Sequence, residues 1–333
     1  MRYSRRDFGR LALAGIPAAA MLKALPESSL EARDKINPKI GGVTIGAITY
    51  SFRSIQDPME ILKAYTTIGL GEMELMSNHA EALAGMPSGR GGGGGRRGGA
   101  PPTPEQIAAR DAAAKAIADW RKSATEATFK PVRHKIADAG VDLRLLCYNM
   151  SALRTQQDGR VTGTTDDDIE YGFMMARWLG VEAMSTSTQV SMAKRIAPFA
   201  DKHRMMIGFH GHANTTNPDE VATPETFDAV MAASKYHGAN LDIGHYTEAG
   251  YDSVAFILKN HARITNLHLK DKKKAVNGGQ NGPWGTGDTP IKDVLKLVQK
   301  NKYKFPCNIE FEYDGEPVAE VTKCFQLCKE MLA

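Results

Sequence analysis

The sequence has no long apolar run, only four cysteines and little net charge. Its clearest apolar stretch, residues 11–22, is too short and too alanine-rich for a stable membrane span. The cysteines lack zinc-site spacing, so we expect buried thiols at Cys147, Cys307, Cys324 and Cys328. The 42 basic and 38 acidic residues leave a net charge of +4 without a basic stripe, which argues against nucleic-acid binding.

Other missing patterns narrow the fold. No glycine-rich turn follows the first predicted strand at residues 49–53, which argues against a doubly wound dinucleotide-binding sheet. The glycine-rich stretch at 88–103 is not framed by the strand, lysine and helix of a phosphate-binding loop, so we expect a disordered surface insertion. The sequence also has no internal repeat of the kind that forms a solenoid.

The N-terminus has the order of a twin-arginine export signal. Ser4, Arg5, Arg6, Asp7 and Phe8 precede the short apolar run, so we expect residues 1–35 to be a signal and linker. The protein is therefore predicted to be periplasmic or otherwise exported, with no membrane span in its mature form.

From residue 40 to 333, apolar strand-like runs alternate with helical patterns. We predict strands at 41–52, 69–77, 141–150, 180–187, 205–212, 239–245, 264–271 and 305–314. The predicted helices cover 57–68, 104–139, 166–179, 190–203, 224–236, 253–259, 291–301 and 318–331. Eight strands, each followed by a helix, predict a single-domain α/β fold, the (β/α)₈ TIM barrel.

Polar residues gather where the later strands end, and that end of a barrel carries the active site. Side chains two residues apart on a strand share a face, so each strand brings a pair to the same mouth. The pairs near the last strand ends are His210 with His212, His268 with Lys270, and Glu310 with Glu312, and Asp242 with His245 marks the sixth strand.

Two imidazoles with two carboxylates suit a borderline divalent ion such as Mn²⁺, Co²⁺, Zn²⁺ or Fe²⁺. A single histidine or aspartate at a strand end is more often structural or a helix cap. The joint arrangement on strands five to eight is what predicts a metal site, with Asp242 as one donor.

The stretches "LDIGHYTEAG", "NLHLKDKK", "WGTGDTPIKDVLKLVQ" and "IEFEYD" together resemble the sugar phosphate isomerase/epimerase superfamily, the xylose-isomerase-like barrels, and especially its exported branch. The resemblance implies a divalent ion held by Asp242, His268 and Glu310, with His245 contacting substrate. Where the family's epimerases carry a glutamate on strand five, this sequence has His210, as in inosose-dehydratase-like relatives. Glu312 remains an alternative to Glu310 as the ligand.

The implied chemistry is proton abstraction next to a carbonyl of an unphosphorylated sugar or keto-sugar. Candidate catalytic residues are Glu310, Glu312, His212 and Lys270, and candidate substrate contacts are His245, Glu74, His79 and Trp284. Isomerisation or epimerisation is the first expectation. The same intermediate would serve a 3-keto-glycoside lyase or hydratase, or an inosose-dehydratase-like enzyme.

Two readings from other classes stay open. One is hydrolysis by a metal-bound hydroxide, as in endonuclease-IV-like barrels, although the modest charge argues against it. The other is a non-catalytic sugar-binding protein. For the first expectation the partner is a small-molecule sugar substrate, with no nucleic acid, and a homo-oligomer is compatible with the sequence.

Overall fold

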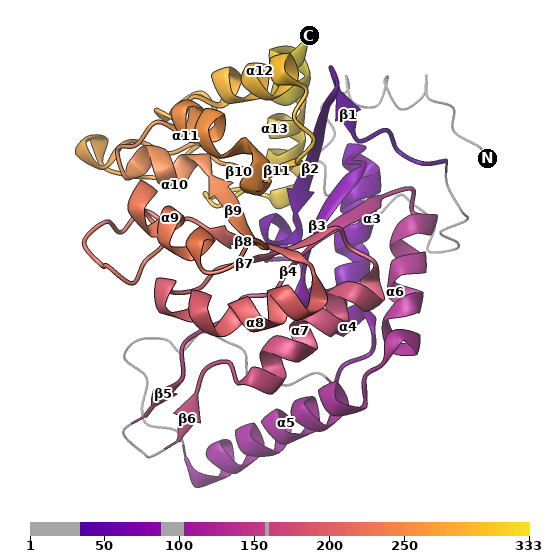
Figure 1. The fold of residues 1–333 in the computed structure, drawn as a ribbon. Helices are drawn as coiled ribbons and strands as arrows, with labels where there is room; N and C mark the ends of the chain where they lie inside the picture. Colours follow the sequence, from indigo (N-terminus) through magenta and orange to yellow (C-terminus); the bar gives the residue numbers. More distant parts are fainter. Residues whose placement is uncertain (1–33, 88–102, 157–159) are drawn as a thin grey trace, which may run out of the picture.

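Eight parallel strands close into a barrel at the centre of the molecule (Figure 1). The computed structural model describes residues 34–87, 103–156 and 160–333. Pairing of the first barrel strand with both the second and the last completes the ring. In chain order the strands are β2 (Val43–Ile48), β3 (Glu72–Met76), β4 (Asp142–Cys147), β7 (Ala183–Thr186), β8 (Met206–His210), β9 (His237–Asp242), β10 (Ile264–Leu269) and β11 (Cys307–Ile309).

The predicted (β/α)₈ barrel is therefore confirmed. Short strands lie outside the ring, namely β1 (Lys39–Ile40), antiparallel to β2, and the hairpin of β5 (Arg154–Thr155) and β6 (Val161–Thr162). The proposed export signal and almost all of the glycine-rich stretch fall outside the described residues.

Helices surround the barrel, and most begin at a residue whose side chain caps the first turn. The helix α7, for example, starts after a Thr165 capping box and ends at Gly180, whose φ of 71° is left-handed. The helices are α3 (Pro58–Ile68), α4 (Ser77–Leu83), α5 (Pro104–Ser123), α6 (Glu126–Asp138), α7 (Asp166–Leu179), α8 (Ala193–His203), α9 (Pro224–Ala232), α10 (Ile243–Glu248), α11 (Ser253–Asn260), α12 (Ile291–Asn301) and α13 (Pro317–Leu332), with short 3₁₀ turns η1 (Thr49–Phe52), η2 (Val190–Met192), η3 (His261–Arg263) and η4 (Ala275–Asn277).

The continuous helical pattern predicted over 104–139 is two helices. The chain turns extended at Ala124 and Thr125, and a new capping box at Thr125 starts α6. The sequence pattern also missed α4 and α10, which are one to two turns long. Among the described residues, no helix combines the length and apolar character that a membrane crossing needs.

The interior of the barrel is polar, while the layer between strands and helices is apolar. Side chains from non-adjacent strands meet across the interior, where Glu72 accepts from Asn308 and Glu74 accepts from Asn266 at 2.9 Å. All four of these residues are buried. The predicted thiols at Cys147, Cys307, Cys324 and Cys328 are free and buried, as expected. The polar interior forms a floor beneath the strand ends that carry the candidate site.

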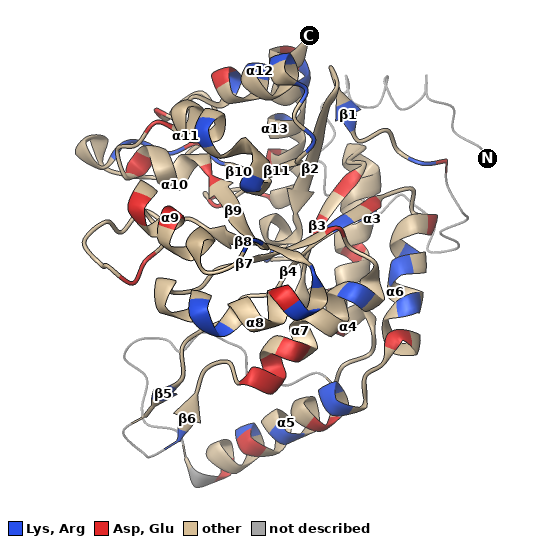
Figure 2. Cartoon of the chain, in the orientation of Figure 1, with Lys and Arg blue, Asp and Glu red and all other residues tan. Residues whose placement is uncertain are grey.

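Figure 2 shows basic and acidic residues distributed over the surface rather than gathered into one large field. One local exception is the first turn of α7, which holds Asp166, Asp167 and Asp168.

Candidate metal centre and active site

Four buried side chains converge at the carboxyl ends of four consecutive strands. One ligand atom from each of them lies within 4.8 Å of the others. They are the four residues proposed as ligands from the sequence, His210 on β8, Asp242 on β9, His268 on β10 and Glu310 just after β11. The structure thus places Glu310, rather than Glu312, with the other three.

Strand order and register explain the convergence. The strands β8, β9, β10 and β11 are neighbours in the ring, and His268 lies opposite Asp242. His210 pairs with Asn240, two residues before Asp242, which reflects the stagger of barrel strands. The backbone N–H of Glu310 donates to the Leu269 carbonyl at 3.0 Å, extending the ladder past the end of β11.

Asp242 has a double role at the end of β9. Its Oδ1 accepts the backbone N–H of His245 at 2.8 Å and so caps α10. Its Oδ2 is buried and accepts no well-directed hydrogen bond, although the Lys270 ammonium lies 3.0 Å away. The cap fixes the carboxylate so that its other oxygen faces the cluster.

His268 lies between two carboxylates. Its Nε2 is 2.7 Å from Glu74 Oε2, and its Nδ1 is 3.1 Å from Glu310 Oε2. Burial alone would lower the pKa of His268, but the charges of Glu74 and Glu310 outweigh it and raise that pKa well above its ordinary value. The contact with Glu74 fixes the Nε2 side of the ring, so the Nδ1 side faces the cluster. An outer carboxylate orients a metal-ligating histidine in the same way.

Lys270 brings a buried ammonium to the same place. Its Nζ lies 2.9 Å from Glu310 Oε2 and 2.6 Å from Glu312 Oε2, in addition to its contact with Asp242. Burial opposes the charged form, but the three carboxylates prevail and the pKa of Lys270 is raised. The ammonium therefore stays charged, and the negative charges of the three carboxylates more than balance it.

A cavity of about 300 Å³ opens above the cluster. Four histidines are among its lining residues. Here His212 Nε2 lies 3.2 Å from Ser187 Oγ, and His245 Nε2 lies 3.1 Å from Lys270 Nζ. The cavity is lined by Ile48, Tyr50, Met76, Cys147, Asn149, Ser187, His210, His212, Asn240, His245, His268, Lys270, Glu310 and Glu312.

Each of these two histidines has a carboxylate behind it. His212 Nδ1 is 2.7 Å from Glu220 Oε1, and His245 Nδ1 is 3.6 Å from Glu248 Oε2. The nearby His245 ring and the Lys272 ammonium, 2.7 Å from Glu248 Oε2, lower the pKa of Glu248 to about 2. Burial, followed by the charge of His245, lowers the pKa of His212.

The donor set fits a divalent transition metal. Burial, followed by the charges of His268 and His212, lowers the pKa of His210 well below its ordinary value, so its imidazole is neutral, the form that binds a metal. His268, whose pKa is raised, would release a proton when it binds the ion. His210 Nδ1 is buried without a hydrogen-bond partner. Two imidazoles and two carboxylates, converging and incompletely satisfied, could hold one such ion, whose identity the donors leave open among several.

Three predicted substrate contacts lie elsewhere. Glu74 is under the floor, with its oxygens bound to Ser185, Asn266 and His268. Trp284 packs in the hydrophobic core. His79 is hydrogen-bonded to Thr49 at 2.9 Å and does not line the cavity. The position of a residue along its strand does not predict whether its side chain lines the cavity or lies deeper in the barrel interior.

Other cavity residues were missed by the sequence analysis. Tyr50 sits on the 3₁₀ turn η1, where the two-residue alternation of a strand no longer applies. Asn149 and Ser187 lie just beyond their strands and carry no distinctive spacing. The carboxylates Glu220 and Glu248 support histidines from a loop and a short helix that the sequence pattern did not reveal.

Comparison with known proteins agrees with this architecture. Residues 185–330 match the family described as "Xylose isomerase-like TIM barrel". The chain is 26% identical over 156 residues to an inosose dehydratase of Clostridium perfringens, which is 41% of this chain and 51% of that protein. It is 28% identical over 151 residues to an inosose dehydratase of Clostridium botulinum, an alignment that covers 39% of this chain and 49% of that protein. The chain spans about half the length of the curated relatives it matches.

Solved structures share the fold at low sequence identity. A probable 3-DHS dehydratase, AsbF, of Bacillus anthracis aligns with a TM-score of 0.57 and 15% identity, covering 85% of this chain and 98% of that one. A sugar phosphate isomerase/epimerase of Parabacteroides distasonis aligns with a TM-score of 0.55 and 15% identity, covering 91% of this chain and 99% of that one. The IOLI protein with a binding zinc atom aligns with a TM-score of 0.55 and 10% identity, covering 86% of this chain and 95% of that one.

Proposed function

We propose that this chain, a xylose isomerase-like TIM barrel, is a divalent-metal-dependent enzyme that removes a proton next to the carbonyl of an unphosphorylated sugar or keto-sugar. The observation that carries the proposal is the convergence of His210, Asp242, His268 and Glu310 at the base of a cavity with further acid–base groups. When bound, the ion would polarise the carbonyl and stabilise the negative charge that develops on its oxygen.

Glu312 is the best base in the cavity. Glu310 is buried and engaged by His268 and Lys270, whereas the Glu312 side chain lines the cavity and is 21% exposed. Lys270 holds the Glu312 carboxylate at 2.6 Å and so orients it. Lys270 can also donate a hydrogen bond to a substrate oxygen.

His212 and His245 also line this cavity, and the Lys270 ammonium is 2.6 Å from Glu312 Oε2 and 3.1 Å from His245 Nε2. A carboxylate base with imidazoles nearby suits elimination. In that reaction the base takes the carbon-bound proton, and the C–H electron pair forms a C=C bond while the carbonyl pair moves onto oxygen. The carbonyl then re-forms, the double bond shifts to the α and β carbons, and the β C–O bond breaks, so that the hydroxyl takes a proton from an imidazolium and leaves as water. We therefore favour a dehydratase or lyase, an assignment also supported by the names of the inosose dehydratase relatives.

Isomerisation or epimerisation, the first expectation from the sequence, is the second candidate. It uses the same proton abstraction and returns the proton to carbon, and the neighbouring Parabacteroides structure bears that name. An epimerase with two opposed carboxylates is less well supported, because the cavity-lining carboxylates Glu310 and Glu312 both follow β11.

The charge of the cavity supports an unphosphorylated substrate. Lys270 is the one lysine or arginine among the described lining residues, and three carboxylates already neutralise it. A phosphate would find no free cation there. The export signal proposed for residues 1–35 fits a substrate met outside the cytoplasm.

The test combines metal analysis with product NMR. The purified protein is incubated in D₂O with inososes, 3-keto-glycosides and free ketoses. We expect bound metal and an unsaturated product, or carbon-bound deuterium if isomerisation dominates. The Asp242→Ala variant should lose both metal and turnover.

Asp252→Ala is the matched control, since Asp252 caps α11 and does not belong to the cluster. Full metal content and turnover in Asp242→Ala would overturn the proposal. Tight sugar binding without metal, product or deuterium would instead support a non-catalytic binding protein.

A further inference from the structure

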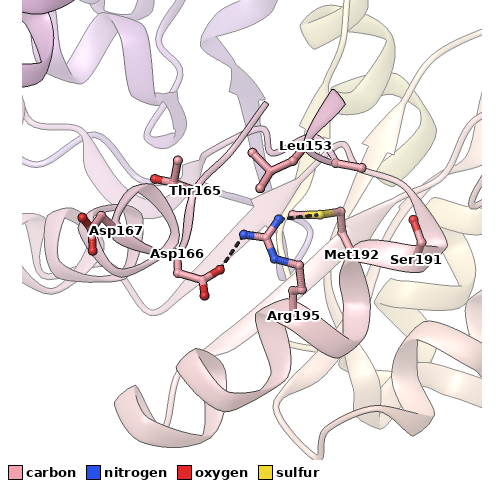
Figure 3. A pocket seen from close by; sticks show the side chains of 8 residues that line it. Leu153, Thr165, Asp166, Asp167, Ser191, Met192 and Arg195 are labelled. Carbon is pink, nitrogen blue, oxygen red and sulfur yellow. Dashed lines mark hydrogen bonds and ion pairs between the residues drawn. The ribbon is translucent and has the colours of Figure 1, made fainter. Parts of the chain in front are cut away.

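A second cavity, of about 710 Å³, lies beside the start of α7 and the start of α8 (Figure 3). It is lined by Ala152, Leu153, Thr165, Asp166, Asp167, Ser191, Met192 and Arg195. None of these residues belongs to the candidate metal cluster or to the described lining of the smaller cavity.

The two cavities are built on the same two loops. Asn149 and Ser187 line the smaller cavity, while Ala152 and Ser191 line the larger one, three and four residues further along. Even a fully extended chain covers at most about 14 Å in four residues. The loops are tied together, since the Ser187 N–H donates to Asn149 Oδ1 at 2.8 Å and the Ala152 N–H donates to Gln189 Oε1 at 2.9 Å. The second cavity is therefore a close and fixed neighbour of the active-site cavity.

The lining of the second cavity offers both donors and acceptors. The Arg195 guanidinium lies between Asp166 Oδ1, at 2.5 Å, and Met192 Sδ, at 3.7 Å (Figure 3). An arginine has five N–H donors, so these two contacts leave several for a ligand. The Arg195 side chain is 32% exposed, and the carboxylate of Asp167 extends the acceptor surface. Leu153, 45% exposed, adds an apolar face.

Charge selects the class of ligand. Asp166 and Asp167 outnumber the single guanidinium of Arg195, so the described lining carries a net negative charge. A phosphate or carboxylate would be repelled, whereas a neutral group with many hydroxyls could use the donors, the acceptors and the apolar face together.

We propose that the second cavity is a sugar subsite. It binds a neutral sugar unit, or a similar polyhydroxylated group, attached to the ring that enters the active-site cavity. This inference rests on the proposed function, and it narrows the substrate class to glycosides larger than one ring. The volumes agree, since about 300 Å³ suits a single small ring and about 710 Å³ accommodates a further unit.

The test measures binding and needs no turnover. Calorimetry and saturation-transfer NMR are run on the full protein with glucose, cellobiose, maltose and glucose 6-phosphate as probes. Leu153→Trp fills the apolar face of the second cavity. Leu258→Trp, at a residue that is 50% exposed on α11, is the matched control.

We expect a disaccharide to bind more tightly than glucose, with saturation reaching both of its rings. Leu153→Trp should weaken disaccharide binding at least tenfold, leave glucose binding unchanged and remove saturation from one ring, while Leu258→Trp changes nothing. Absence of disaccharide binding, equal loss for glucose, or tighter binding of glucose 6-phosphate would each overturn the subsite.

Asp242→Ala in the same assay separates the two proposals. If Asp242→Ala keeps metal and turnover but Leu153→Trp still weakens only the disaccharide, the function fails and the subsite stands. If Asp242→Ala loses metal and turnover while Leu153→Trp has no effect, the subsite fails alone.

Discussion

At the scale of single residues, Glu74 shows how a buried side chain can serve a site that it does not reach. It lies beneath the cavity and accepts from Ser185 and Asn266 while contacting His268 Nε2 at 2.7 Å. These contacts fix the ring plane of His268, so the free edge of that ring points at the cluster.

Replacing Glu74 by glutamine should weaken metal binding by about 10- to 100-fold, because the outer carboxylate no longer orients His268 or supports its basicity. Calorimetric titration of the metal-free protein with Mn²⁺ or Zn²⁺ measures the change. Glu72→Gln is the control, since Glu72 is buried on the same strand but contacts Asn308 instead of His268. Equal affinities for wild type and Glu74→Gln would show that Glu74 has only a packing role.

His79 gives a prediction on pH and stability. Burial lowers its pKa to about 4 in the folded protein, from an ordinary 6.5. As the pH falls, the unfolded chain therefore takes up the proton before the folded protein does. The contribution of neutral His79 to the free energy of unfolding is complete above about pH 6.5 and is lost as the pH falls toward 4. The loss amounts to at most about 3 kcal/mol, at 1.36 kcal/mol per unit.

His79→Asn preserves a polar group near Thr49 but cannot titrate. Urea unfolding at intervals from pH 7 to pH 4 should show a shallower loss of stability for His79→Asn than for wild type. Parallel curves would mean that the histidine is protonated in the folded state as readily as in the unfolded chain.

At the scale of elements, the sequence allowed the order and type of the barrel strands to be predicted, because each is a short apolar run bounded by a cap or glycine. Residues 205–212 and 264–271, for instance, enclose β8 and β10. The helix α10 was missed because it is six residues long and begins directly at the carboxylate that ends β9.

The residues of the cluster could be found for a related reason. Barrel topology makes the ends of β8 to β11 meet, so a polar residue at each end predicts a shared site. Layer depth within the barrel could not be predicted, since it depends on strand stagger, and this is why Glu74 was placed in contact with substrate. Trp284 was misplaced because its loop folds against the core.

Two glycines of the loop after β10 are held by one carboxylate. Asp271 Oδ2 accepts the backbone N–H groups of Gly285 at 2.7 Å and Gly287 at 3.0 Å. A Cβ at Gly287 would lie 2.1 Å from Asp271 Oδ1 and 2.8 Å from the Lys272 carbonyl. The close approach of backbone to carboxylate requires glycine at this position.

Gly287→Ala should therefore lower the free energy of unfolding by about 1–3 kcal/mol, the usual cost of overpacking. Urea denaturation measures the loss. Gly282→Ala is the control from the same loop, because its added methyl would meet only the rotatable hydroxyl of Thr286. If the two variants were equally stable, the Asp271 contacts would not constrain the loop.

At the scale of the whole molecule, the candidate ligands come from four neighbouring strands, so a bound ion would link half of the barrel. The predicted (β/α)₈ barrel is confirmed, and residues 185–330 match the xylose isomerase-like TIM barrel family. The twin-arginine branch, export and homo-oligomer formation remain predictions.

Metal removal should destabilise the folded protein. At a free metal concentration 100 times Kd, binding to the native state alone adds about 2.7 kcal/mol. Thermal unfolding with Mn²⁺ or Zn²⁺, compared with a chelator, should show a rise in Tm of several degrees for wild type and none for Asp242→Ala. A similar rise in that variant would place the stabilising ion at another site.

The order of the strands has a consequence for biosynthesis. The ribosome releases β8, β9 and β10 before β11, and Glu310 follows β11. The nascent barrel therefore stays unclosed until β11 has left the ribosome and paired with β2. The four candidate ligands can hold the proposed ion together only after that step.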